Sequence, residues 1–571
     1  MFNMNLRIFS KVATWTFSSI RSASSLPAPK HITSKPQVEY RDLCGIAMNL
    51  YTSGIEAISS QTMVEDALKF NAENQLLELQ ARDTTKHKIR SSSYHINKNV
   101  HIIAVGKAVI GMCRSVEDIL GDHIVRGLAF VPENSVKDLE AAGKKHLFPS
   151  SRFELVLGSH AAGSEQSLES ARRVLEITQS LQANDILITL ISGGGSALLT
   201  MPKPSLTLED KIKCIELMKS HKVPYLDQNT VRKNLSMLKG GGLSASASPA
   251  KVISLILSNL PHNSYTEVAG GLTTSDSSTP QQAMEVLRKY KLVEQMPSAV
   301  VNFLEKECHE STTNNWCLNG PAFTDTWEER PKSRYDTSNT INILAGSDEI
   351  AIATILNQCA KYEIPAHAIE PSRISTSTLE SGKLFACLAL YAAALVTRNY
   401  NEEQDRRLIK IELDCIRLGM PKTELKSIAI IANEARSTKK PICLIFTSEI
   451  VIDVKEGSPG RGGRCQEVAL ATAINLQKKY SEHESLRRCD VQLLSVDSDG
   501  IDGGNEVAGA IANCTQADQI VCGKTAQQYL DEHDSYTFYK NLESGKYHVS
   551  TGATGIDVQN FQLLLIRNNS W

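Results

Sequence analysis

The sequence predicts an α/β protein with two domains and a ligand cleft between them. Short apolar runs, such as 100–105 and 185–191, each lead through a polar turn into an amphipathic segment, as strands and helices do in a doubly wound sheet. A second series of such units begins near residue 341, and 571 residues suffice for two separate cores. We therefore expect a doubly wound, Rossmann-like domain over 41–300, a linker or insertion over 301–340 and a second α/β domain over 341–571.

The composition favours small molecules as partners. A formal net charge of −2 without long Lys or Arg runs gives no electrostatic basis for binding nucleic acid. The thirteen cysteines include no CxxC pair, so neither a structural zinc site nor a disulfide framework is indicated. No apolar run reaches the length of about 18 residues that crosses a bilayer, so we expect no membrane insertion.

The N-terminal segment has the pattern of a mitochondrial presequence. Its first 38 residues contain no Asp or Glu but include Arg7, Lys11 and Arg21. A helix over residues 5–21 would place apolar side chains on one face and basic ones on another. We expect residues 1–35 to direct the chain to the mitochondrial matrix; a cytoplasmic protein with a disordered basic tail is the alternative.

Two strands of the first domain end in polar loops that carry candidate ligand-binding side chains. The strand over 100–105 runs into Gly106-Lys107-Ala108, and a lysine at a strand-to-helix turn can reach a phosphate. The strand over 153–157 leads to His160, which could contact a ligand or be structural.

The central strand over 185–191 is followed by a loop of small residues. Backbone amides in such a loop form a cradle for an oxyanion or a phosphate. The loop is not a dinucleotide fingerprint, because Leu198 occupies the third glycine position and no acid follows on a strand. The candidate anion-binding residues are Ser192, Gly193, Gly194, Gly195 and Ser196.

A basic segment over 229–239 precedes the next strand, 252–257. If it is helical, Arg232 and Lys239 lie on one face, which either binds an anion or is a solvated basic surface. The strand after it ends in Ser258-Asn259-Leu260.

The second domain contains a Gly-rich motif, 460–467, directly before a helical segment. Glycine lets the backbone approach a ligand, while Arg461 and Arg464 add guanidinium groups suited to phosphate or carboxylate oxygens. The motif is not a Walker A loop, since Gly463-Arg464 replaces the Lys-Ser/Thr pair.

An acidic loop follows the predicted strand 491–496 in the same domain. Asp499 and Asp502 could hold a hard cation or orient a hydroxyl at the carboxyl end of that strand. A calcium loop fits poorly, because Ile501 and Ala508 occupy two of its ligand positions.

Taken in order, these motifs resemble the class II glycerate kinases, whose N-terminal doubly wound domain is joined to a C-terminal domain named for a Met-Phe-Arg-Leu motif. The resemblance covers most of residues 41–567. It implies ATP-dependent phosphorylation of D-glycerate with Mg²⁺ in the interdomain cleft. It leaves open the hydroxyl that is phosphorylated and the oligomeric state, for which a homodimer is one compatible assembly.

The resemblance also assigns roles to residues. It implies that Lys107 and one arginine, either Arg461 or Arg464, contact substrate or the transferred phosphate. Asp499 and Asp502 are expected to bind the metal or a substrate hydroxyl. The expected substrate- and phosphate-binding residues are Ser192 to Ser196, Arg232, Lys239 and His160.

Several positions depart from the family pattern. Asn259 stands where the family has an aspartate that is a candidate catalytic group, and an amide cannot accept a proton as a general base. Ile556-Asp557 replaces a Thr-Asn pair, and Cys465 replaces an asparagine. Two functions remain compatible with the sequence: an active kinase, and a catalytically weakened relative that binds a metabolite or a partner.

Overall fold

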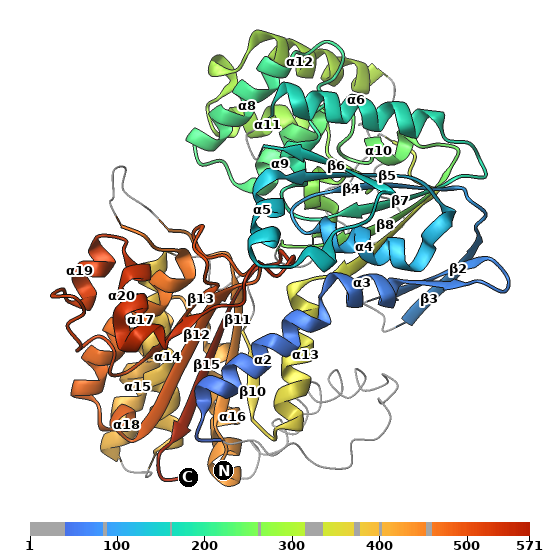
Figure 1. Ribbon diagram of the computed structural model, residues 1–571. Helices are drawn as coiled ribbons and strands as arrows, with labels where there is room; N and C mark the ends of the chain where they lie inside the picture. The colour runs from blue at the N-terminus through green and yellow to red at the C-terminus, as the bar shows by residue number, and fades with distance from the viewer. Residues whose placement is uncertain are drawn as a thin grey trace, which may run out of the picture.

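The computed structural model describes residues 40–83, 88–159, 163–260, 264–313, 335–369, 377–398, 402–452 and 460–571. These residues form two α/β domains that meet along one side (Figure 1). The predicted presequence, His160 and residues 314–334 of the predicted linker lie outside the described residues.

The first domain is built on a six-stranded sheet in which all strands run parallel, in the order β6-β5-β4-β7-β8-β9. The order reverses between β4 and β7, which is the switch point of a doubly wound sheet, as predicted. The strands are β4 (Val100–Val105), β5 (Ile124–Pro132), β6 (Phe153–Gly158), β7 (Ile186–Ile191), β8 (Lys251–Leu257) and β9 (Thr340–Gly346).

Several helices of this domain begin where the sequence supplies capping side chains. The Ser164 side chain accepts from the Ser167 amide, and Thr207 forms the same reciprocal cap with Asp210. The helices are α3 (Ser60–Ala67), α4 (Val109–Leu120), α5 (Glu133–Ala141), α6 (Glu165–Ser180), α7 (Gly195–Leu198), α8 (Leu208–Ser220), α9 (Tyr225–Asn234), α10 (Gly242–Ser246), α11 (Pro280–Lys289) and α12 (Ser298–Thr313). A small antiparallel sheet stands beside them, with strands β1 (Leu68–Asn71), β2 (Leu76–Asp83) and β3 (Lys88–His95).

The second domain contains a mixed sheet in the order β10-β11-β15-β12-β13-β14. Only β10 and β11 pair in parallel, and the other neighbours are antiparallel. The strands are β10 (Ala366–Ala368), β11 (Ile442–Ser448), β12 (Cys489–Asp497), β13 (Gly509–Asn513), β14 (His548–Val549) and β15 (Asn560–Asn568). The helices are α13 (Asp348–Lys361), α14 (Thr378–Val396), α15 (Glu402–Arg417), α16 (Lys422–Thr438), α17 (Arg464–Glu482), α18 (Glu484–Arg487), α19 (Ala526–Asp531) and α20 (Ser535–Asn541).

The domain boundary differs from the predicted one in two places. The strand assigned to the second domain at 341–345 is β9, which pairs with β8 and completes the first sheet. In addition α2 (Leu43–Ala57) packs against α13 and against β12 and β15, so the start of the chain covers the second sheet (Figure 1). Local patterning predicted the strand at 341–345 but carries no information on which sheet it joins.

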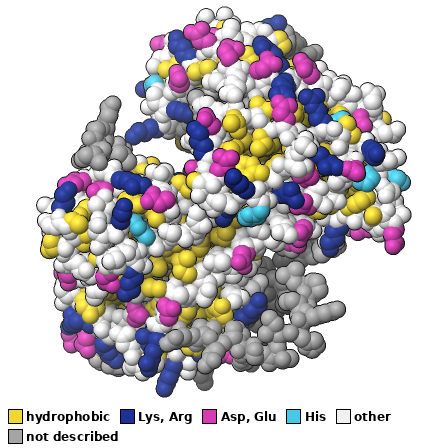
Figure 2. All heavy atoms as spheres, in the orientation of Figure 1, with side chains coloured by type: hydrophobic (Ala, Val, Ile, Leu, Met, Phe, Trp, Pro, Cys, Tyr) yellow, Lys and Arg dark blue, Asp and Glu magenta, His cyan; other side chains and the backbone are white. Residues whose placement is uncertain are grey.

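Helix α14 corrects the expectation that no segment is long and apolar enough to cross a membrane. Its 19 residues meet that criterion, with a mean hydropathy of 1.5, but 78% of the apolar window is buried inside the protein. The helix packs against α17 and is a core helix of the second domain. Figure 2 shows basic and acidic side chains interspersed over the visible face, in keeping with the nearly neutral net charge.

Candidate active site

The switch point of the first sheet brings two of the predicted motifs together. The Lys107 amide donates to the Gly193 carbonyl at 2.9 Å, and the Ala108 amide donates to Ser192 Oγ at 3.0 Å. Gly106 allows this approach, because it has a φ of +134° and a Cβ at this position would collide with Ser192 Oγ. Lys107 therefore lies beside the loop Ser192–Ser196, as expected for loops that follow neighbouring strands at a switch point.

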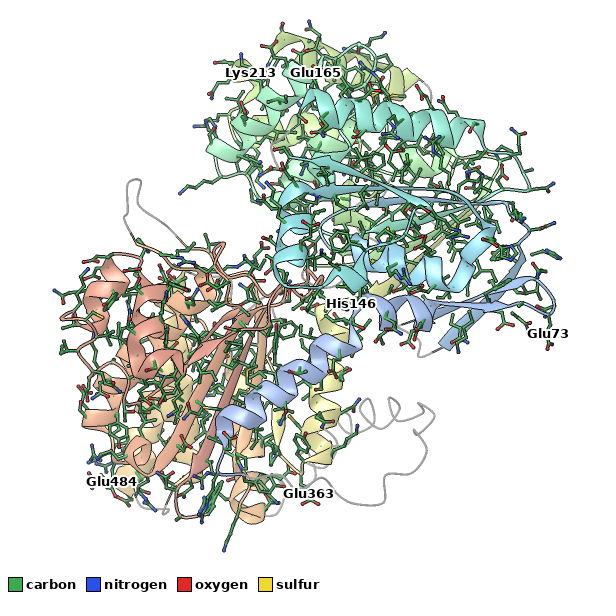
Figure 3. The ribbon with its side chains drawn as sticks, in the orientation of Figure 1. Glu73, His146, Glu165, Lys213, Glu363 and Glu484 are labelled. Atoms are coloured by element: carbon green, nitrogen blue, oxygen red, sulfur yellow. The ribbon has the colours of Figure 1, made fainter. Side chains whose placement is uncertain are left out.

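A pocket of about 350 Å³ lies between this region and the second domain. The first domain contributes Lys107, Ser135, Asp138 and Leu139, and the second contributes Asp499, Ile501, Ala553, Gly555, Ile556 and Asp557. The two domains also approach each other beside this pocket. Leu147 of the first domain, which follows the His146 labelled in Figure 3 in the sequence, would lie 3.3 Å from a Cβ at Gly555 of the second. The interdomain ligand cleft expected from the sequence is thus present. A larger surface hollow near Glu484 is lined by none of the predicted site residues.

Asp557 brings a carboxylate from the second domain to the first. A Cβ at Gly193 would collide with both Asn259 Nδ2 and Asp557 Oδ2, so both side chains approach the same point of the loop. The Oδ2 atom of Asp557 is buried and has no hydrogen-bond partner among the described residues. Burial raises the pKa of Asp557 to about 6, and the positive charge of Lys107 opposes that rise.

The acidic loop after β12 carries two carboxylates with different surroundings. Asp497 is buried, and its Oδ2 accepts from Arg464 Nη2 at 2.9 Å and from Arg464 Nε at 3.2 Å. Asp499 lines the pocket, where burial raises its pKa well above the usual range, with further contributions from Asp497 and Asp557. Asp499 therefore holds a proton more readily than a free carboxyl group, and it lies among other acidic side chains at the pocket.

Asp502, the other predicted metal ligand, holds the start of α17. Its oxygens accept from the Cys465 amide at 3.0 Å, from the Gln466 amide at 2.8 Å and from Gln466 Nε2 at 3.0 Å. A carboxylate at a helix N-terminus is stabilised by these donors and by the helix dipole. Gly463 leaves room for it, because a Cβ there would collide with the carboxylate.

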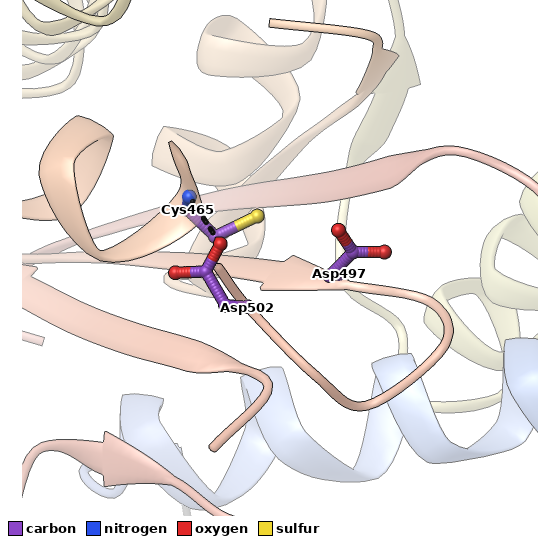
Figure 4. A group of neighbouring side chains, drawn as sticks. All are labelled: Cys465, Asp497 and Asp502. Carbon is purple, nitrogen blue, oxygen red and sulfur yellow. Dashed lines mark hydrogen bonds between the residues drawn. The ribbon is translucent and has the colours of Figure 1, made fainter. Parts of the chain in front are cut away.

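The ligand atoms of Cys465, Asp497 and Asp502 lie within 4.8 Å of one another (Figure 4). This group suits Mg²⁺ poorly, because Mg²⁺ prefers oxygen ligands and burial holds the pKa of the Cys465 thiol well above its usual value. Asp502 already accepts three hydrogen bonds, and Asp497 is paired with Arg464. Of the two predicted metal ligands, Asp499 is the one that lines the pocket.

The two arginines of the Gly-rich motif have separate surroundings. Arg464 pairs with Asp497, and its Nη1 lies 3.8 Å from Glu449 Oε1. Arg461 instead donates from Nε to Asn505 Oδ1 at 2.6 Å, and its guanidinium lies 3.9 Å from the centre of the Tyr536 ring. Arg464 also contributes to the electrostatic environment of Asp557. Arg464 is therefore the arginine nearer the pocket carboxylates.

Three basic side chains lie close together near Ser196: Lys239 and Lys211 are buried, and Arg232 is part-buried. Lys239 Nζ donates to the Ser196 carbonyl at 3.0 Å, and Arg232 donates to Ser196 Oγ. Lys211 Nζ donates to the Met201 carbonyl at 3.4 Å. Burial lowers the pKa of Lys211 to about 7 and that of Lys239 well below its usual value, and the neighbouring cations lower both further.

Within the described parts of the chain, the hydrogen-bond partners of these three side chains are neutral oxygens, and Arg232 Nε has none. The prediction that Arg232 and Lys239 share one helical face is wrong, because helix α9 ends at Asn234. Lys239 lies in the segment after the helix, and both side chains reach Ser196. Lys211 was missed in the sequence because α8 reads as an ordinary amphipathic helix. Two buried lysines and a part-buried arginine without a carboxylate partner are suited to an anion, which would favour the protonated form of the lysines.

We expect inorganic phosphate to stabilise the protein through this cluster. Phosphate at ten times its dissociation constant should raise the free energy of unfolding by about 1.4 kcal/mol, which corresponds to a rise of roughly 2–4 °C in melting temperature. Scanning fluorimetry across a phosphate series measures the rise, and Lys211→Met should abolish it. Lys213→Met, on the same helix and labelled in Figure 3, is the matched control that should retain it. An equal rise in both variants would place the phosphate elsewhere.

Comparison with known proteins covers both domains. The family described as a domain of unknown function, DUF4147, matches residues 46–305, and the MOFRL family matches residues 442–560. Glycerate kinase of Rattus norvegicus is 29% identical, with 91% of this chain and 92% of that protein covered. Glycerate kinase of Macaca fascicularis is 30% identical over 74% of this chain and 99% of that protein. A crystal structure of glycerate kinase from Thermotoga maritima, 24% identical, has the same fold with a TM-score of 0.64 over 92% of this chain and all of that one.

Proposed function

The chain belongs to the glycerate kinase family, and on that premise we propose that it transfers the γ-phosphoryl group of ATP to a hydroxyl of D-glycerate. The observation that carries the proposal is the pocket between the domains, where Lys107 faces Asp499 and Asp557 beside an amide-rich loop. Phosphoryl transfer depends on positioning and on charge stabilisation, and the lysine, the carboxylates and the backbone amides at this pocket can provide both.

The positive groups have complementary tasks in this proposal. Lys107 binds the transferred phosphoryl group from the first domain, while Arg464 orders the acidic loop through Asp497. The loop Ser192–Ser196, with Arg232 and Lys239 behind it, binds a phosphate or the carboxylate of the substrate. In this proposal Gly193, Gly194 and Gly195 keep the role predicted from the sequence, as residues whose backbone amides help to form the anion cradle.

ATP-dependent transfer implies Mg²⁺, which takes oxygen ligands and usually combines one or two carboxylates with substrate phosphates. We propose Asp499 as the protein ligand, because it lines the pocket and because burial, together with the neighbouring Asp497 and Asp557, raises its pKa. A divalent cation relieves such repulsion. When bound, Mg²⁺ neutralises charge on the phosphates; Asp499 positions it relative to Lys107.

A non-catalytic binding protein is the second candidate, and Asn259 favours it, because an amide accepts no proton. An ADP-release assay with Mg²⁺-ATP and D-glycerate, on protein lacking residues 1–35, separates the two. The kinase should turn over at about 1–100 per second. ADP release no faster than without D-glycerate, together with calorimetric binding of D-glycerate, would establish the binding protein instead.

We also propose that residues 1–35 target the chain to the mitochondrial matrix, as their basic, acid-free composition indicates. A reporter fused to residues 1–38 should be imported and processed. A cytoplasmic reporter would support the alternative.

A further inference from the structure

Asn259 and Asp557 form a facing pair across the domain boundary. Asn259 follows β8 in the first domain, and Asp557 precedes β15 in the second. Asn259 Nδ2 and Asp557 Oδ2 converge on the side of Gly193 where a Cβ would stand, and a Cβ there would collide with both atoms. Gly193 has no side chain, so both groups can approach its backbone at this point.

This pair offers one donor and one acceptor to whatever occupies that point. The amide Nδ2 of Asn259 donates hydrogen bonds, and an ionised carboxylate only accepts them. A hydroxyl group matches both, since its oxygen accepts from Asn259 while its proton is donated to Asp557. The lack of a partner for the buried Asp557 Oδ2 is therefore explained if a substrate hydroxyl supplies one.

The neighbouring carboxylates are already engaged. Asp497 is paired with Arg464, and Asp502 accepts from Cys465 and Gln466 at the start of α17. Asp499 accepts from the Ile501 amide at 2.9 Å. Asp557 is the member of this group whose buried oxygen is unpartnered among the described residues and which also touches the loop of the first domain.

We propose that Asp557 is the general base of the reaction and that Asn259 holds the substrate hydroxyl by donating a hydrogen bond to its oxygen. We call Asn259 and Asp557 the exchangeable pair, because the carboxylate could stand at either of the two positions. The role rests on the proposed kinase function. The hydroxyl O–H bond breaks and its proton moves to Asp557 Oδ2. A bond forms between the hydroxyl oxygen and the γ-phosphorus of ATP, and the bond from that phosphorus to the β,γ-bridging oxygen breaks, releasing ADP.

The sequence pattern agrees with an exchange. The resemblance described above implies a carboxylate at position 259 and an asparagine at position 557, and this chain has Asn259 and Asp557 instead. Because the two side chains face each other across Gly193, the pair keeps its composition of one acid and one amide. On this proposal the general base is not lost with Asn259; it stands at Asp557 instead.

The first test is Asp557→Asn, which removes the charge at nearly constant volume. Steady-state ADP release should show kcat lowered by about a hundredfold or more, with KM for D-glycerate within about threefold, because a general base contributes mainly to the chemical step. Melting temperatures confirm that the variant is folded. A kcat within about threefold of the unmodified chain would overturn the proposal.

The second test moves the carboxylate. Asn259→Asp alone restores the family residue, yet it should lower kcat, because it places two carboxylates at one point. The double variant Asn259→Asp with Asp557→Asn should recover at least about tenfold over Asp557→Asn. Two results would overturn the exchangeable pair: a kcat of Asn259→Asp above that of the unmodified chain, or a kcat of the double variant no higher than that of Asp557→Asn. Absence of turnover in the unmodified chain would instead defeat the kinase function itself.

Discussion

Replacing Lys107 by alanine should lower kcat by about a hundredfold to a thousandfold, the loss seen when one preorganised donor to developing charge is removed. The backbone of Lys107 is fixed to Gly193 in the neighbouring loop, so its side chain starts from a defined position at the switch point. It also lines the interdomain pocket opposite Asp499 and Asp557. An alanine leaves the loops in place but removes the positive charge that faces these carboxylates.

The measurement is steady-state ADP release at saturating Mg²⁺-ATP and D-glycerate. Lys137→Ala is the matched control, because Lys137 lies exposed on α5 in an ion pair with Glu133 at 2.7 Å. The control should retain full activity, since exposed ion pairs contribute little. Similar activity of both variants would show that Lys107 does not act on the transferred group.

Arg464→Ala should be far more damaging than Arg461→Ala, in both activity and stability. Arg464 neutralises the buried Asp497, and breaking a partly buried ion pair costs up to about 3–5 kcal/mol because a charge is left uncompensated. We also expect kcat to fall by about a hundredfold, since the loop that carries Asp499 begins at Asp497.

Arg461 provides the matched comparison from the same motif. Its pair with Glu506 is half-exposed, so Arg461→Ala should cost less than about 1 kcal/mol and leave kcat within about threefold. Arg464→Lys separates charge from geometry, because lysine keeps the charge but lacks the planar fork that binds Asp497 through two nitrogens. Greater sensitivity at Arg461 than at Arg464 would contradict this assignment.

The sequence predicted the parts of the site that local patterning determines. Lys107 and Ser192–Ser196 each follow an apolar strand, and a doubly wound sheet brings the ends of neighbouring strands together, so their contact could be expected. The Gly-rich motif was expected to precede a helix, and α17 begins within it. Its role as an anion site is modified, because the helix start is occupied by the carboxylate of Asp502.

Other features depend on contacts between distant segments. The pairing of β9 with β8 and the packing of α2 on the second sheet join residues far apart in sequence, which periodicity does not encode. The same holds for Lys211, whose helix pattern gives no sign of its electrostatic interaction with Arg232 and Lys239. Asp557 was noted only as a departure from the family pattern; its position against Gly193 gives that departure a physical meaning.

Phosphorus NMR of the reaction with Mg²⁺-ATP and D-glycerate tests the central claim most directly. A phosphomonoester resonance should grow in step with ADP and in equal amount, because one phosphoryl group is transferred per turnover. Coupling to one proton identifies the 2-phosphate and coupling to two identifies the 3-phosphate. The kinase predicts this resonance from the unmodified chain and its near absence with Asp557→Asn. ADP accompanied only by inorganic phosphate, or no ADP at all, would contradict the account.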